Sequence, residues 1–72
     1  MDELRKQFGE NLRALRDATD ISQERLAELA GLDRTEISLL ERGLRMPRLD
    51  TIVCLAKGLQ LGSPAELLDD ML

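Results

Sequence analysis

The sequence predicts an all-α domain of five helices, and both its composition and its helix-boundary residues support this class. Leu, Ala, Glu and Arg, which are strong helix formers, dominate the 72 residues, whereas Phe8 is the only aromatic residue. Apolar residues recur at spacings of three and four, and Ser, Asp, Gly and Pro stand where helices would begin or end. No repeat, low-complexity tract or linker divides the chain, so residues 1–72 are expected to form one domain.

The first predicted helix carries a single apolar stripe. Its members lie three or four residues apart and are Leu4, Phe8, Leu12 and Leu15. Gly9 lies within this helix, where glycine costs about 1 kcal/mol relative to alanine. We therefore expect the backbone at Gly9 to contact a neighbouring helix closely.

A second helix is predicted at residues 22–30. Ser22 is a suitable N-cap for this helix, and Gly31 is a suitable left-handed residue after its last turn. The inner face is expected to be formed by Leu26, Leu29 and Ala30.

A third helix is predicted at residues 33–42, with Asp33 as its N-cap. Glu36, three residues after Asp33, is the expected partner in a capping box. The inward-pointing residues are expected to be Ile37 and Leu40. Because only a short turn separates this helix from the second, the two must cross steeply, which predicts a helix-turn-helix.

Two further helices are predicted after Pro47. The fourth spans about residues 49–60, contains Cys54 as a small buried residue, and has an apolar side formed by Ile52, Leu55, Ala56 and Leu59. The fifth opens with Ser63 as N-cap and Pro64 at its first position. Its apolar residues are Leu67, Leu68, Met71 and Leu72.

The charge of the chain is unevenly distributed. The net charge of −4 and the pI near 4.7, taken alone, argue against a nucleic-acid partner. However, the stretch from Arg42 to Arg48 contains three arginines and no acidic residue. We therefore expect one basic surface on an otherwise acidic domain.

The outer face of the third predicted helix has the residue types of a major-groove reader. Leu39 lies about 200° around the helix from Ile37, so it cannot share the core face, although it could be an exposed leucine without a partner. Arginine can bind guanine bidentately, hydroxyls reach several bases, and an apolar tip can touch a thymine methyl group. The predicted base-contacting residues are Arg34, Thr35, Ser38 and Leu39, and the predicted phosphate-binding residues are Arg42, Arg45 and Arg48.

The chain resembles the phage repressor and Cro-like, or XRE-type, family of helix-turn-helix regulators. The resemblance covers about residues 8–68 and is carried by Phe8–Arg16, Ser22–Ala27, Gly31–Ser38, Glu41–Gly43 with Pro47, and Leu55–Leu59. Within it, Leu32–Ser38 is similar to the controller regulators of restriction–modification systems. Two residues depart from the family. Arg48 stands where the family often has a serine as the cap of the fourth helix. Glu36 places a carboxylate on or near the expected DNA-facing side, where it could accept a hydrogen bond from N4 of cytosine, only cap the helix, or weaken phosphate contact, and capping is the favoured alternative.

The resemblance implies a lambda-repressor-like five-helix domain that binds a palindromic double-stranded DNA operator as a two-fold homodimer. Its third helix would lie in the major groove. Family matching also implies that Gln23 contacts phosphate or an outer base and that Arg16 pairs with Glu41.

A second subunit is the expected source of added stability, because a core of this size supplies only a few kcal/mol. The single cysteine excludes an internal disulfide, the absence of histidine leaves no common zinc pattern, and no metal or cofactor is expected. The apolar C-terminal residues could simply close the core, but a dimer interface is the favoured alternative. The interface is expected to contain Val53, Leu61, Leu67, Leu68, Met71 and Leu72.

These features favour a sequence-specific transcription regulator, acting as a repressor or autoregulator. The alternative is a protein-interaction module with the same fold, such as an antitoxin-like or adaptor protein, which the acidic pI favours. An enzyme is not expected, since the chain has no His, no Tyr and no glycine-rich phosphate loop. Without a membrane-spanning stretch or a leader, the chain is expected to be cytoplasmic and bacterial or phage-encoded.

Overall fold

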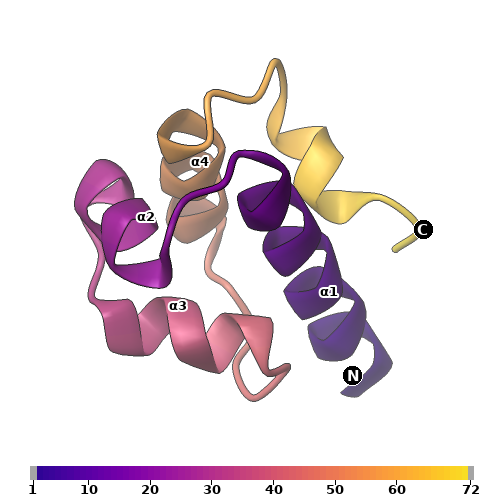
Figure 1. The fold of residues 1–72 in the computed structure, drawn as a ribbon. Helices are drawn as coiled ribbons and strands as arrows, with labels where there is room; N and C mark the ends of the chain where they lie inside the picture. Colours follow the sequence, from indigo (N-terminus) through magenta and orange to yellow (C-terminus); the bar gives the residue numbers. More distant parts are fainter. Residues whose placement is uncertain (1, 72) are drawn as a thin grey trace.

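The computed structural model describes residues 2–71, which form four α-helices followed by one 3-10 helix (Figure 1). The elements are α1 (Asp2–Ala18), α2 (Gln23–Ala30), α3 (Arg34–Glu41), α4 (Leu49–Gly58) and the 3-10 helix η1 (Pro64–Leu68). No strand occurs among these residues, so the predicted all-α helix-turn-helix fold is confirmed. None of the helices within residues 2–71 has both the length and the apolar character needed to cross a membrane.

The prediction of a fifth α-helix is wrong, because the last element, η1, is a short 3-10 helix. The Ser63 hydroxyl accepts a hydrogen bond from the N–H of Ala65 at 3.1 Å, and the Ser63 carbonyl accepts from the N–H of Glu66 at 3.2 Å. Asp69 then leaves the helical region, and Asp70 has a positive φ of 63°. The segment is thus too short for repeated α-helical bonds, and 3-10 bonds satisfy its ends instead.

One hydrophobic core joins all five elements. In Figure 1, α1 lies beside α3 and η1, while α4 packs against α2 and η1. The buried apolar residues are Phe8, Leu12, Leu26, Ala27, Ala30, Ile37, Leu40, Leu55, Ala56, Leu59 and Leu67. Among residues 2–71, no other helix packs on the side of α3 that faces away from this core.

The inward position predicted for Leu29 is wrong, since this residue is 44% exposed. The core face of α2 is formed by Leu26, Ala27 and Ala30, and Leu29 lies about 100° away from the centre of that face. Because α3 and α4 both pack on the side of the two alanines, Leu29 lies at the edge of the core, where it lines an open depression with Ile21 and Leu59.

The expected close approach at Gly9 is confirmed. A Cβ atom placed on Gly9 would lie 2.5 Å from the carbonyl oxygen of Leu40 and 2.7 Å from that of Glu41. Both atoms belong to the backbone of α3, so only glycine allows α1 to approach the end of α3 this closely.

The predicted caps are confirmed for α2 but not for α3. The Ser22 hydroxyl accepts from the N–H of Arg25 at 3.0 Å, and Gly31 ends α2 in the left-handed region with a φ of 71°. Asp33 has the extended backbone of an N-cap, but its side chain makes no capping hydrogen bond. Glu36 forms an ion pair with Arg45 instead, because an arginine is a stronger partner for a carboxylate than a neutral backbone N–H.

An asparagine fastens the C-terminal segment to α1. The Nδ2 atom of Asn11 donates hydrogen bonds to the carbonyl of Leu67 at 3.0 Å and to the carbonyl of Asp69 at 2.7 Å. Leu67 is fully buried in the core, so its predicted place in a dimer interface is wrong. Leu72, predicted for the same interface, lies outside the described residues.

Candidate nucleic-acid interface

The outward side of α3 carries most of the predicted base-contacting residues, because Ile37 and Leu40 bind the opposite side to the core. Arg34 and Thr35 are exposed and Ser38 is half-buried. Leu39, predicted to be exposed, is also half-buried. Arg34, Thr35, Ser38 and Leu39 together form the reading face of α3.

A hydrogen-bonded node at Glu41 fixes α3 relative to the two preceding helices. Arg16 on α1 donates to the carboxylate through Nε to Oε2 at 2.6 Å and through Nη2 to Oε1 at 3.1 Å. Gln23 at the start of α2 donates from Nε2 to the same Oε1 at 3.0 Å. The side chains of Arg16 and Glu41 are 13% and 4% exposed, so the implied ion pair is present and largely shielded from water.

All three nitrogen atoms of the Arg16 guanidinium donate hydrogen bonds. Its Nη1 atom donates to the backbone carbonyl of Ile21 at 2.7 Å, in the turn between α1 and α2. The hydrogen bond to Glu41 raises the pKa of Arg16 above its ordinary value, and burial opposes this rise with a smaller effect. One arginine thus connects α1, the following turn and α3.

Two ion pairs border the reading face. On one flank, Arg34 lies 3.3 Å from a carboxylate oxygen of Glu24 on α2. On the other flank, Glu36 pairs with Arg45 from the segment that follows α3. Residues 34 and 36 lie about 200° apart around a helix, which is why their partners come from opposite sides.

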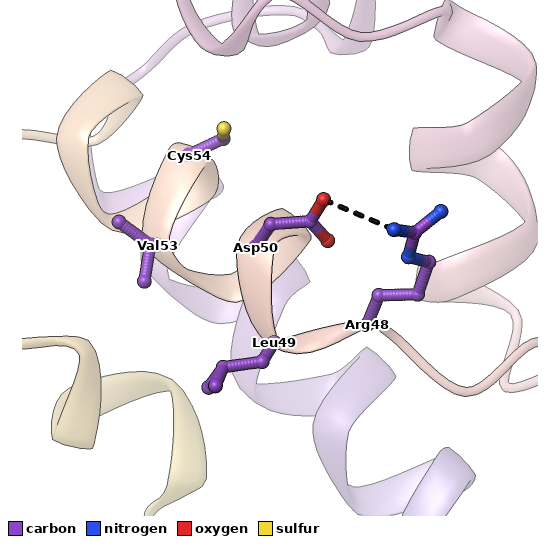
Figure 2. Close-up of a pocket in the computed structure, with 5 residues that line it drawn as sticks. All are labelled: Arg48, Leu49, Asp50, Val53 and Cys54. Carbon is purple, nitrogen blue, oxygen red and sulfur yellow. Dashed lines mark ion pairs between the residues drawn. The ribbon is translucent and has the colours of Figure 1, made fainter.

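The loop between α3 and α4 supplies further cationic side chains. Arg42 is exposed and makes no ion pair within residues 2–71, whereas Arg48 lies 3.4 Å from Asp50 (Figure 2). The loop turns at Gly43, whose φ is 72°. An open depression of about 420 Å³ separates this loop from the turn before α3, and Glu36, Arg45 and Arg48 are among its lining residues.

The loop also exposes two apolar side chains that the sequence patterns did not predict. Leu44 and Met46 are both exposed, next to the arginines. A loop has no helical period, so the sequence contains no signal that could have assigned a buried or an exposed side to these residues.

A second surface, on α4, is mainly apolar. Leu49 is 78% exposed and lines an open depression of about 650 Å³ together with Val53, Cys54 and the Arg48–Asp50 ion pair. Figure 2 shows Leu49 and Val53 one turn apart on the same side of α4. The Cys54 thiol is free and half-buried against the core, so the prediction of a buried Cys54 is only partly met.

Among residues 2–71, no group of His, Cys, Asp and Glu side chains is arranged to hold a metal ion. The site places guanidinium groups, hydroxyls and one leucine around α3, whose C-terminal end is bound through Glu41. Guanidinium and hydroxyl groups bind anions and the polar edges of other molecules.

A steeply crossed helix pair with such a face, held in an all-α core, defines the helix-turn-helix class of DNA-binding proteins. The family model described as "Helix-turn-helix domain" matches residues 7–69. The chain belongs to the XRE-type helix-turn-helix family of DNA-binding transcriptional regulators, which is a family of regulators and not of enzymes.

Within this family the chain is similar to restriction–modification controller proteins. It is 40% identical to control protein C.SmaI of Serratia marcescens over 62 residues, which cover 86% of this chain and 74% of that protein. It is 42% identical to control protein C.BamHI of Bacillus amyloliquefaciens over 67 residues, covering 92% and 82% respectively. The crystal structure of controller protein C.AhdI from Aeromonas hydrophila superposes with a TM-score of 0.84 at 46% identity, covering 88% of this chain and 94% of that one.

Proposed function

We propose that this protein is a repressor or autoregulator that binds a palindromic DNA operator as a homodimer, with α3 in the major groove. The observation that carries the proposal is the Glu41 node, which joins α3 to α1 and α2 while its reading face points away from the core. A helix anchored in this way can place several side chains on base edges at once. The similarity to C.SmaI, C.BamHI and C.AhdI supports a controller role, and such a regulator works in the cytoplasm beside its DNA.

The proposed contacts fall into two groups. The reading face contacts base edges, and the arginines of the following loop, Arg42, Arg45 and Arg48, contact phosphates and set the register. Gln23 already donates one N–H to Glu41, and the second N–H of its amide is left to reach a phosphate.

The proposed dimer interface is the apolar surface of α4 and the segment after it. Leu49 joins the predicted interface because its side chain is mostly exposed beside Val53. The remaining members are half-buried residues that keep part of their surface outside the core, namely Leu61, Leu68 and Met71. Pairing these surfaces in two copies would remove apolar area from water.

Selection of binding sites from random duplexes at physiological salt tests the proposal. We expect enrichment of a two-fold symmetric site with half-sites about one helical turn apart. Sedimentation of the same sample is expected to give a dimer. Arg34→Ala is expected to abolish enrichment at one symmetric position, while Arg13→Ala, an exposed arginine on α1 paired with Asp17, is expected to leave the selected site unchanged.

A protein-interaction module with the same fold is the second candidate. It is supported by the net charge of −4 and by the carboxylates that already occupy Arg34, Arg45 and Arg48. Weak DNA binding that does not change with salt would favour this function, because phosphate contacts make affinity fall steeply as salt rises.

A further inference from the structure

Glu36 holds an unusual position for a carboxylate near a proposed DNA surface. It lies in the first turn of α3, and its side chain is only 21% exposed. Its partner, Arg45, comes from the loop nine residues later and is about half exposed. The pair lies in the depression between the turn before α3 and the loop after it, where Arg48 also points.

This pair differs from the other two ion pairs of the surface. Arg34 with Glu24 and Arg48 with Asp50 are separated by 3.3 Å and 3.4 Å, and all four side chains are well exposed. Water and salt screen such pairs, so their carboxylates are easily turned away from an approaching phosphate. Glu36 is better shielded from water and lies on the recognition helix itself. Its charge is therefore screened less, and its side chain cannot turn away from an approaching phosphate as easily.

We propose that Glu36 is a specificity-determining residue that exchanges Arg45 for the N4 amino group of a cytosine when the operator is bound. This inference rests on the proposed function. A carboxylate only accepts hydrogen bonds, and in the major groove N4 of cytosine is a donor that fits it. Released from Glu36, Arg45 is free to bind a phosphate.

On DNA without that donor, the exchange is unfavourable. If Arg45 moved to a phosphate there, the Glu36 carboxylate would remain without a partner close to the negatively charged backbone. If Arg45 stays with Glu36, one phosphate contact is lost. Either way non-specific DNA binds weakly, so Glu36 acts chiefly by penalising wrong sequences.

The test compares wild-type protein with Glu36→Gln and with the matched control Glu28→Gln. Glu28 is an exposed helical carboxylate that pairs with Arg25 at 3.0 Å on α2, so both variants lose one negative charge and one arginine partner. Affinities are measured for the selected operator, for an operator with its C·G pairs replaced singly, and for an unrelated duplex over a range of salt concentrations.

Glu36→Gln is expected to bind the unrelated duplex about tenfold more tightly and to steepen the logarithmic salt dependence by about one unit, as Arg45 neutralises one more phosphate. Its preference for one C·G pair per half-site is expected to fall about tenfold, because the amide of Gln donates as well as accepts and so fits other bases too. The double variant Glu36→Gln with Arg45→Ala is expected to lose the gain on unrelated DNA. Thermal unfolding of each variant confirms that it is folded.

Equal behaviour of Glu36→Gln and Glu28→Gln in both affinity and base preference would overturn the inference, as would a gain that survives Arg45→Ala. A wild-type protein that selects no site would instead overturn the proposed function, and with it any specificity for Glu36 to set. A wild-type protein that selects a site which Glu36→Gln reads identically would overturn only the role of Glu36.

Discussion

Arg16 and Glu41, 25 residues apart in the chain, meet in a two-point contact in which Nε lies 2.6 Å from Oε2 and Nη2 lies 3.1 Å from Oε1. The contact joins the end of the recognition helix to α1, and Gln23 adds α2 to the same carboxylate. The orientation of α3 is therefore fixed by polar bonds at its C-terminal end as well as by apolar packing along its length.

Glu41→Ala is expected to destabilise the fold by about 3 kcal/mol, because Arg16 would be left as a shielded charge without its partner. Urea unfolding measures this loss. The control Glu28→Ala removes a carboxylate from an exposed pair and is expected to cost less than about 1 kcal/mol. Equal losses in the two variants would show that the node contributes no more than a surface pair.

The contribution of Arg16 is expected to be constant with pH over the neutral and moderately alkaline range. A raised pKa means that the stabilisation is complete below the unfolded-state pKa and is lost only as pH rises through the higher folded-state value. The ordinary pKa of an arginine is already far above neutral pH, and that of Arg16 in the folded state is higher still. The difference in unfolding free energy between wild type and Arg16→Met should therefore stay level from about pH 7 to about pH 10. A decline within that range would contradict a raised pKa of Arg16 in the folded state.

Gly9→Ala is expected to destabilise the fold by about 1–3 kcal/mol, although alanine is the better helix former. The added Cβ would meet the carbonyl oxygens of Leu40 and Glu41, which are backbone atoms that cannot rotate aside. Gly62→Ala is the control, since the nearest atom to its Cβ would be a side-chain oxygen 3.8 Å away. Thermal unfolding compares the two, and an unchanged melting temperature for Gly9→Ala would contradict the close approach of α1 and α3.

Arg34→Ala and Arg42→Ala are expected to weaken DNA binding in different ways. Arg34 lies on the reading face, so its loss should cost about 1–3 kcal/mol at the operator and relax the preference at one base position. Arg42 is exposed at the end of α3, so its loss should weaken all sequences similarly and reduce the salt slope by about one. Titrations of operator and unrelated duplex separate the two patterns, and identical patterns would contradict the division into base and phosphate contacts.

Leu49→Glu is expected to shift the protein from dimer to monomer without destabilising the monomer, because its side chain has little burial to lose. Leu29→Glu places the same charge on another exposed leucine, on α2, and is expected to leave the dimer intact. Sedimentation velocity measures both. A dimer that withstands Leu49→Glu would place the interface elsewhere.

Features that depend on local rules could be predicted from the sequence. Ser22 caps α2 and Gly31 ends it because both act on neighbouring backbone groups. Gly9 was also predicted correctly, since a glycine inside a strong helix pattern has few explanations other than close packing. The Arg16–Glu41 pair came only from family resemblance, because its partners are far apart in the chain.

Features that depend on three-dimensional placement could not be predicted. Leu29 and Leu67 both fit a helical stripe, yet the first is exposed and the second is fully buried, and only the positions of the other helices decide this. Glu36 could have bonded to a backbone N–H at the start of α3, but it pairs with Arg45 from the following loop instead. The bond from Asn11 to the C-terminal carbonyls had no signal at all, because an asparagine on an amphipathic helix is ordinarily solvated.

The hydrogen bonds from Asn11 give α1 a mechanical role in the proposed dimer. Helix α1 contacts the recognition helix through Gly9 and Arg16, and it also binds the C-terminal segment that follows η1. In the proposed dimer, the spacing between the two recognition helices would then depend on α1 as well as on the apolar surface of α4 that carries Leu49. One additional base pair between the half-sites would turn one of them by about 35° around the DNA axis. A dimer of fixed geometry would then no longer fit both half-sites.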